Sequence, residues 1–144
     1  LATTLGMIKF KEIFGDYKPV QATVNTTSCF MDGVQFVAGT TVANHGLKIE
    51  DEKVSSVIFS KKACERAVKV SVKESSRDFM KENYPEFTQL RESLFTEGAE
   101  KTPEQMANFR AMALETAFKM VENDAVENIF EVEVISVPVT EKVD

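Results

Sequence analysis

An alternating run near the middle of the chain constrains the fold more than any other feature. Val68, Val70 and Val72 alternate with polar residues at positions 69, 71 and 73. Successive side chains of a strand point to opposite faces, so this run predicts a strand that is buried on one face only. The apolar run at 57–59 lies just before it and predicts its hairpin partner. The chain therefore needs a sheet with one covered face.

Helical patterns on either side of this hairpin can supply that cover. Residues 1–14 carry apolar side chains at nearly helical spacing, and Gly15 follows them as a stop. Thr102, Pro103 and Gln105 predict the start of a longer helix, with threonine as N-cap and glutamine completing a capping box. The apolar stripe of that helix is wide enough to face a sheet, or a sheet and a partner together.

Shorter signals complete the expected topology. Two helical turns are predicted after residue 74, the first capped by Ser76 and Asp78, the second opened by Pro85 and closed by Gly98. Further strands are predicted around residues 20–24, 47–49 and 130–139. We therefore expect a single α+β domain over residues 1–144, with a mixed or antiparallel sheet of about four or five strands and helices packed on it.

The segment at 27–47 gathers the chemically unusual residues. It holds one of the two cysteines and the only histidine of the chain. Ser28 can cap a short helix that has Cys29 in its first turn and Gly39 as its stop. The N–H groups and the dipole at a helix start favour an anion and lower a thiol pKa, so Cys29 is suited to metal ligation or nucleophilic chemistry.

Asp32 and His45 are the candidate partners of Cys29. Asp32 lies one helical turn further on and can point to the same side, so we predict Cys29 and Asp32 as the catalytic pair. A loop folded back over the helix start would let Cys29 and His45 share a metal ion or form a thiolate–imidazolium pair. The alternatives are a small buried side chain for Cys29, a helix-terminal anion for Asp32 and a loop residue at positive φ for His45.

The same residues carry a family resemblance. The run Cys29-x-x-Asp32-x-Val34-Gln35-x-x-x-Gly39-x-Thr41, followed by a small-residue loop that ends in Leu47, resembles the core motif of the FmdE family. This family is named for one of the subunits of formylmethanofuran dehydrogenase. Residues 1–14 are similar to its first long helix, and residues 130–134 are similar to its closing strand.

The chain also departs from the family pattern. Members carry a His-Gly-His-x-Cys-Pro-Gly segment ahead of the first helix, where this chain has Leu1. Thr40 stands at the position of the second motif cysteine, and a C-terminal Cys-x-x-Cys zinc finger does not follow. Because zinc usually takes three or four protein ligands, a partner subunit or residues ahead of Leu1 would have to complete a metal site.

The resemblance implies an FmdE-like core that forms a homodimer with a cleft near Cys29. It implies an accessory or standalone protein of an anaerobic microbe, related to methanogenesis, with a thiol-centred pocket for a metal ion or a small molecule. Cys29 and His45 would bind a divalent transition metal such as zinc, and Gln35, Thr40 and Thr41 would contact a cofactor. The alternatives are a non-catalytic dimerisation or interaction module with a decayed site, or a cysteine-dependent enzyme, so catalysis stays open.

Composition limits the partners. Seventeen basic and twenty-three acidic residues give a net charge of −6, which argues against nucleic acid because its phosphates attract a positive surface. Cys29 and Cys64 lie far apart and form neither a Cys-x-x-Cys pair nor a zinc ribbon, and two free thiols fit a reducing, cytoplasmic compartment. We interpret Cys64 as a bystander in a turn. A run of about 20 apolar residues is missing, so we expect no membrane span.

Overall fold

The structure is a computed structural model that describes residues 1–26, 29–50, 52 and 54–138, with the backbone alone for residues 29 and 30. The chain divides into two compact units. One unit comprises Leu1–Val72 with Phe130–Asp144, and the other comprises Lys73–Ile129. The single domain predicted from the chain length is thus a prediction about these two units taken together.

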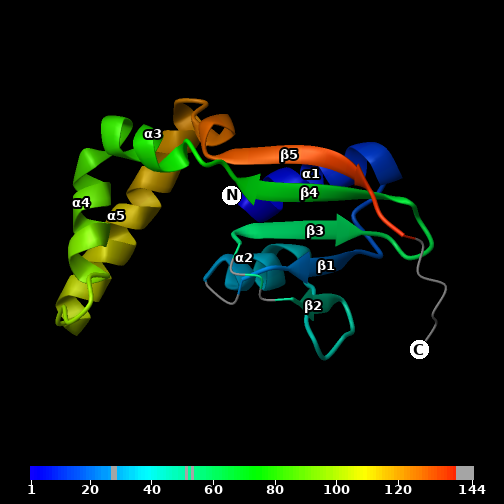
Figure 1. Ribbon diagram of the computed structural model, residues 1–144, viewed down its shortest axis with the longest axis horizontal. Coiled ribbons are helices and arrows are strands. Elements are labelled where there is room, and N and C mark those ends of the chain that lie inside the picture. Colours follow the sequence, from blue (N-terminus) through cyan, green and yellow to red (C-terminus); the bar gives the residue numbers. More distant parts are fainter. Residues whose placement is uncertain (27–28, 51, 53, 139–144) are drawn as a thin grey trace. The chain divides into compact units, whose positions relative to one another are not determined.

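The first unit is built on a five-stranded sheet with the order β2-β1-β3-β4-β5 (Figure 1). The strands are β1 (Gln21–Val24), β2 (Leu47–Ile49), β3 (Ser56–Ser60), β4 (Arg66–Val72) and β5 (Phe130–Ser136). β1 and β2 pair in parallel, and every other neighbouring pair is antiparallel. The prediction of an α+β fold with a mixed sheet is confirmed.

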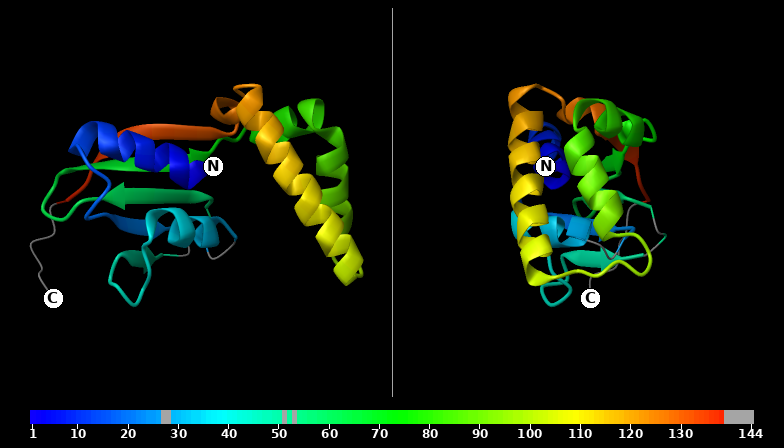
Figure 2. Two further views of the ribbon diagram at one scale, coloured as in Figure 1. Left: turned by 180° about the vertical axis from the view of Figure 1, so that it is seen from behind. Right: turned by 90° about the vertical axis from the view of Figure 1, so that its left-hand side faces the viewer.

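One face of this sheet forms the core, as the alternating pattern predicts. Phe59 of β3 lies in register with Ala22 of β1 and Val68 of β4, and all three are buried. The helices α1 (Ala2–Phe14) and α2 (Cys29–Ala38) cover this face (Figure 2). On the opposite face, within the described part of this unit, no helix lies over the sheet (Figure 1).

A glycine lets α1 approach the sheet closely. A Cβ atom added at Gly6 would lie 2.5 Å from a ring carbon of Phe59 and 2.8 Å from Val70 Cγ2. Real Cβ atoms do not approach other heavy atoms that closely, so α1 can pack on β3 and β4 only with glycine at this position. Gly15, with φ of 85°, ends the helix as predicted.

The second unit is helical. It contains α3 (Ser76–Asn83), α4 (Pro85–Leu94), α5 (Pro103–Glu122) and the short 3-10 turn η1 (Val126–Asn128). Phe109 of α5 contacts both Phe87 and Phe95, with ring centroids 5.6 and 5.3 Å apart. The capping box of α5 is confirmed: Thr102 Oγ1 accepts from the Gln105 N–H at 3.1 Å, and Gln105 Oε1 accepts from the Thr102 N–H at 3.0 Å.

Two helix boundaries in this unit differ from the prediction. Ser76 is the first residue of α3, and the N-cap Ser75 makes no side-chain hydrogen bond. α4 ends at Leu94, four residues before Gly98, because Phe95 leaves the helical conformation and its ring packs edge-on against Phe109. Gly98, with φ of 82°, belongs to the turn that follows. No helix in the described ranges is both long enough and apolar enough to cross a membrane.

Candidate functional site

Cys29 is the first residue of α2, and Asp32 lies exposed in the first turn of this helix. The side chain of Cys29 lies outside the described part of the chain, as does all of Ser28, the predicted cap. Gln35 is half-buried one turn further along α2. The helix predicted around Cys29 is therefore present, whereas the chemistry of its thiol remains a prediction.

The two helices on the sheet begin at the same end of the unit. A Cβ added at Gly33 in α2 would lie 4.0 Å from Thr3 Oγ1, at the start of α1. Met7 of α1 lines a cavity together with Ala38, the last residue of α2. α1 and α2 therefore run in the same direction, and their first turns lie together (Figure 2). Free N–H groups and the positive ends of both helix dipoles meet there.

Two buried polar side chains have an atom without a partner among the described residues. Asn25 follows β1 and is 7% exposed; its Nδ2 donates to Ser56 Oγ at 2.7 Å, but Oδ1 accepts no hydrogen bond. Thr40, predicted to contact a cofactor, is 2% exposed, and its hydroxyl is unpaired. Unpaired buried polar atoms are costly, so each marks a place where a ligand or a water molecule would stabilise the protein.

The loop after α2 is organised by Asn44, a residue that the sequence patterns did not single out. Asn44 Oδ1 accepts from the N–H groups of Thr41 and Gly46, both at 2.9 Å, and its Nδ2 donates to the Gly39 carbonyl at 2.9 Å. Thr41 Oγ1 accepts from the Asn44 N–H at 3.1 Å. Thr41, predicted to contact a cofactor, thus holds the loop, and the tendency of asparagine to bond nearby backbone was the available signal.

The structure does not bring His45 to the start of α2. β1, α2 and β2 form a β-α-β crossover with parallel strands, so α2 must run back along β1. The Gly46 carbonyl accepts from the Ala22 N–H at 2.7 Å, which places His45 beside the beginning of β1. Cys29 lies at the other end of α2, about 15 Å away along a ten-residue helix.

His45 instead shares a hollow with Cys64. This hollow of about 470 Å³ lies against β1, β2 and β3, and the turn after β3 contributes Cys64 to its lining. His45, with φ of 58°, occupies the left-handed region, the backbone conformation given above as its alternative. The strand pairing that joins positions 45 and 64 is a long-range feature without a local sequence signal.

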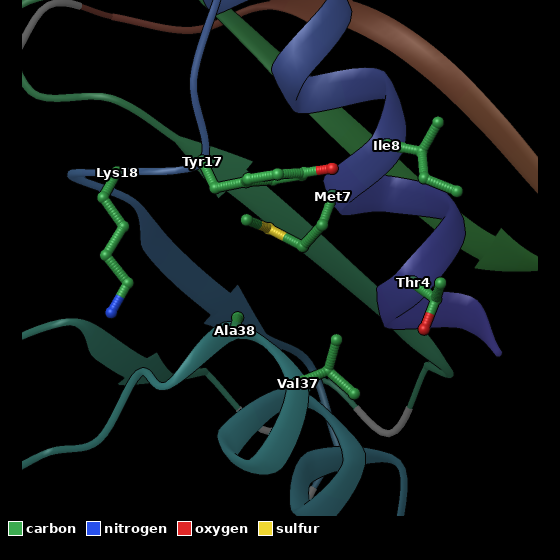
Figure 3. A pocket seen from close by; sticks show the side chains of 7 residues that line it. All are labelled: Thr4, Met7, Ile8, Tyr17, Lys18, Val37 and Ala38. Atoms are coloured by element: carbon green, nitrogen blue, oxygen red, sulfur yellow. The ribbon is translucent and has the colours of Figure 1, made fainter.

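A second cavity, of about 370 Å³, lies between α1 and α2 (Figure 3). Its walls are mostly apolar, and the residues predicted for the functional site do not line it. It is lined by Thr4, Met7, Ile8, Tyr17, Lys18, Val37 and Ala38. Among the described residues, no three of the His, Cys, Asp and Glu side chains gather closely enough to hold a metal ion.

Comparison with known families decides the relationship that the motif suggested. Residues 2–131 match the model of FmdE, described as molybdenum formylmethanofuran dehydrogenase operon. The chain belongs to the FmdE family. The match includes the segment at 27–47 and most of both compact units, so the resemblance inferred from the sequence is confirmed.

A solved structure agrees with the FmdE assignment. The crystal structure of an FmdE-like protein of tungsten formylmethanofuran dehydrogenase, from Syntrophus aciditrophicus, is similar to this chain, with a TM-score of 0.57 and 16% sequence identity. The similarity covers 99% of this chain and 68% of that chain. At this identity the likeness shows a shared fold. The curated proteins compared with this FmdE chain gave no match.

Proposed function

We propose that this FmdE-family chain is a cytoplasmic accessory or standalone protein with a ligand site at the N-terminal end of α2. Cys29 and Asp32 form the centre of the site, which binds a divalent transition metal or a small molecule. The observation that carries the proposal is the meeting of two helix starts, supported by the 4.0 Å separation between Thr3 Oγ1 and a Cβ placed on Gly33. The dipoles of both helices favour a thiolate or carboxylate at that end.

The donor set supports a metal in part. Thiolate sulfur and carboxylate oxygen are ligands of zinc, but a zinc site needs three or four of them. Asn25 Oδ1 is a further buried acceptor without a partner in the described part of the chain, and it lies four residues before Cys29. A second copy of the chain, or residues ahead of Leu1, would supply the remaining ligands, so the proposal includes a homodimer.

A metal analysis of protein purified without a histidine tag tests this proposal. We expect wild type to contain a stoichiometric transition metal and Cys29→Ser to lose most of it, because the substitution removes the thiolate ligand. Cys64→Ser is the matched control, since Cys64 lies in the turn after β3, and it should keep the wild-type content. Metal that survives in Cys29→Ser, or that disappears in Cys64→Ser, would contradict the assignment.

A second candidate is an interaction module without a functional ligand site. Three apolar residues of α5, Leu114, Phe118 and Val121, lie one turn apart on one stripe and are more than half exposed. The 3–4 spacing of these residues is typical of a helix face that docks on another helix. Wild-type protein without metal, and with the same oligomeric state in Cys29→Ser, would favour this second candidate.

A further inference from the structure

We propose that the hollow beside His45 and Cys64 binds a small organic anion, with a carboxylate or phosphate group carried on an apolar body. The hollow lies on the face of the sheet opposite α1 and α2, entirely within the first unit. Its volume of about 470 Å³ falls within the range of roughly 300–1,000 Å³ that is typical of small-molecule sites.

Charge is the first argument for an anion. Lys48, Lys61, Lys62 and His45 line the hollow, and Glu50 is its one acidic lining residue. The whole chain carries a net charge of −6, so this positive lining is a local exception. A concave site lined by one sign of charge raises the local concentration of the opposite ion.

The lysine ammonium groups can turn toward a ligand at little cost. Lys48 Nζ pairs with Glu50 Oε1 at 3.1 Å, with 72% of the lysine side chain exposed. Exposed pairs of this kind contribute little to stability, so a ligand can replace the carboxylate. Lys62 is exposed and has no ion pair within the described ranges.

Lys61 is held more firmly. Its side chain is 25% exposed, its Nζ lies 3.6 Å from Asp16 Oδ1, and the same atom lies 5.9 Å from the centroid of the Phe14 ring. These contacts place the Lys61 charge at the edge of the hollow before a ligand arrives. Pre-positioned charge reduces the ordering cost of binding.

The remaining lining argues for an organic rather than an inorganic anion. Ile58, Val137 and Pro138 contribute apolar surface, while Thr23 and Ser60 contribute hydroxyl groups. Thr23 and Ile58 are paired across β1 and β3, so one wall combines a hydrogen-bonding group with an apolar group. A ligand with an anionic end and an apolar body would use both kinds of contact, whereas a bare ion would use the lysines alone.

Phenyl phosphate and inorganic phosphate form a matched pair of probes. Each is titrated into full-length ¹⁵N-labelled protein while amide chemical shifts are recorded. We expect the shifts to concentrate at residues 45–48 and 58–64, with phenyl phosphate binding about fivefold more tightly because its ring gains apolar contact. Replacing Lys48 and Lys62 together by alanine should weaken binding roughly tenfold or more, since charge-assisted hydrogen bonds are lost.

Lys9→Ala is the matched control, because Lys9 is a partly exposed lysine of α1 that pairs with Glu12 and does not line the hollow. It should bind phenyl phosphate as wild type does. Equal affinity for the two probes, unchanged affinity in the double lysine variant, or shifts located elsewhere would overturn the proposal. The amide spectrum of each unliganded variant checks folding. Because Cys29 takes no part here, failure of this site leaves the metal proposal standing, and the reverse also holds.

Discussion

Replacing Phe59 by alanine is expected to lower the free energy of unfolding of the sheet unit by about 3–5 kcal/mol. Phe59 is completely buried, in register with Ala22 and Val68, and it lies against Gly6 of α1. Alanine would leave a cavity between the sheet and the helix, because close-packed surroundings collapse only in part. A loss of this size is a large share of the stability of an ordinary domain.

Urea unfolding followed through the amide NMR signals of β3 and β4 measures this effect. Phe36→Ala is the matched control, because Phe36 is the same residue type on α2 but is 90% exposed. That substitution should change the unfolding free energy by no more than about 0.5 kcal/mol. Equal effects from the two substitutions would mean that the core does not lie between the sheet and α1.

Gly6→Ala is expected to destabilise the same unit by about 1–3 kcal/mol, although alanine favours a helix over glycine by roughly 1 kcal/mol. The added methyl group would lie 2.5 and 2.8 Å from two ring carbons of Phe59 and 2.8 Å from Val70 Cγ2. Both neighbours are fully buried, so neither can withdraw without disturbing the core. The cost of the clash therefore exceeds the gain in helix propensity.

Gly33→Ala provides a control of opposite sign. Gly33 also lies in a helix, but the nearest atom to an added Cβ is Thr3 Oγ1 at 4.0 Å, an ordinary contact distance. We expect this substitution to stabilise the protein by about 0.5–1 kcal/mol. The same urea titration compares the two variants, and a stabilised Gly6→Ala protein would show that α1 does not approach β3 as described.

Local sequence patterns predicted much of the fold. The alternation around Val68 indicated which face of β4 is buried, and Gly15 marked the end of α1. The capping box at Thr102 and Gln105 predicted the start of α5. Each of these signals depends on residues within a few positions of one another, and strand periodicity or helix capping decides them directly.

The arrangement of the candidate site could not be predicted in this way. The parallel pairing of β1 with β2 places His45 far from Cys29 and beside Cys64, and this pairing depends on chain topology. Likewise, the closeness of Gly33 to Thr3 arises from the packing of two helices on one sheet. Sequence spacing within residues 27–47 identified the unusual residues, but the sheet decides which of them meet.

A zinc titration of ¹⁵N-labelled full-length protein tests the central proposal most directly. Amide shifts report where the metal binds, whichever atoms complete its coordination. We predict that saturating shifts appear at residues 29–33 of α2 and at residues 2–3 of α1, where the two helix starts meet. Shifts confined to the hollow around His45 and Cys64, or a spectrum that zinc leaves unchanged, would contradict a metal site centred on Cys29.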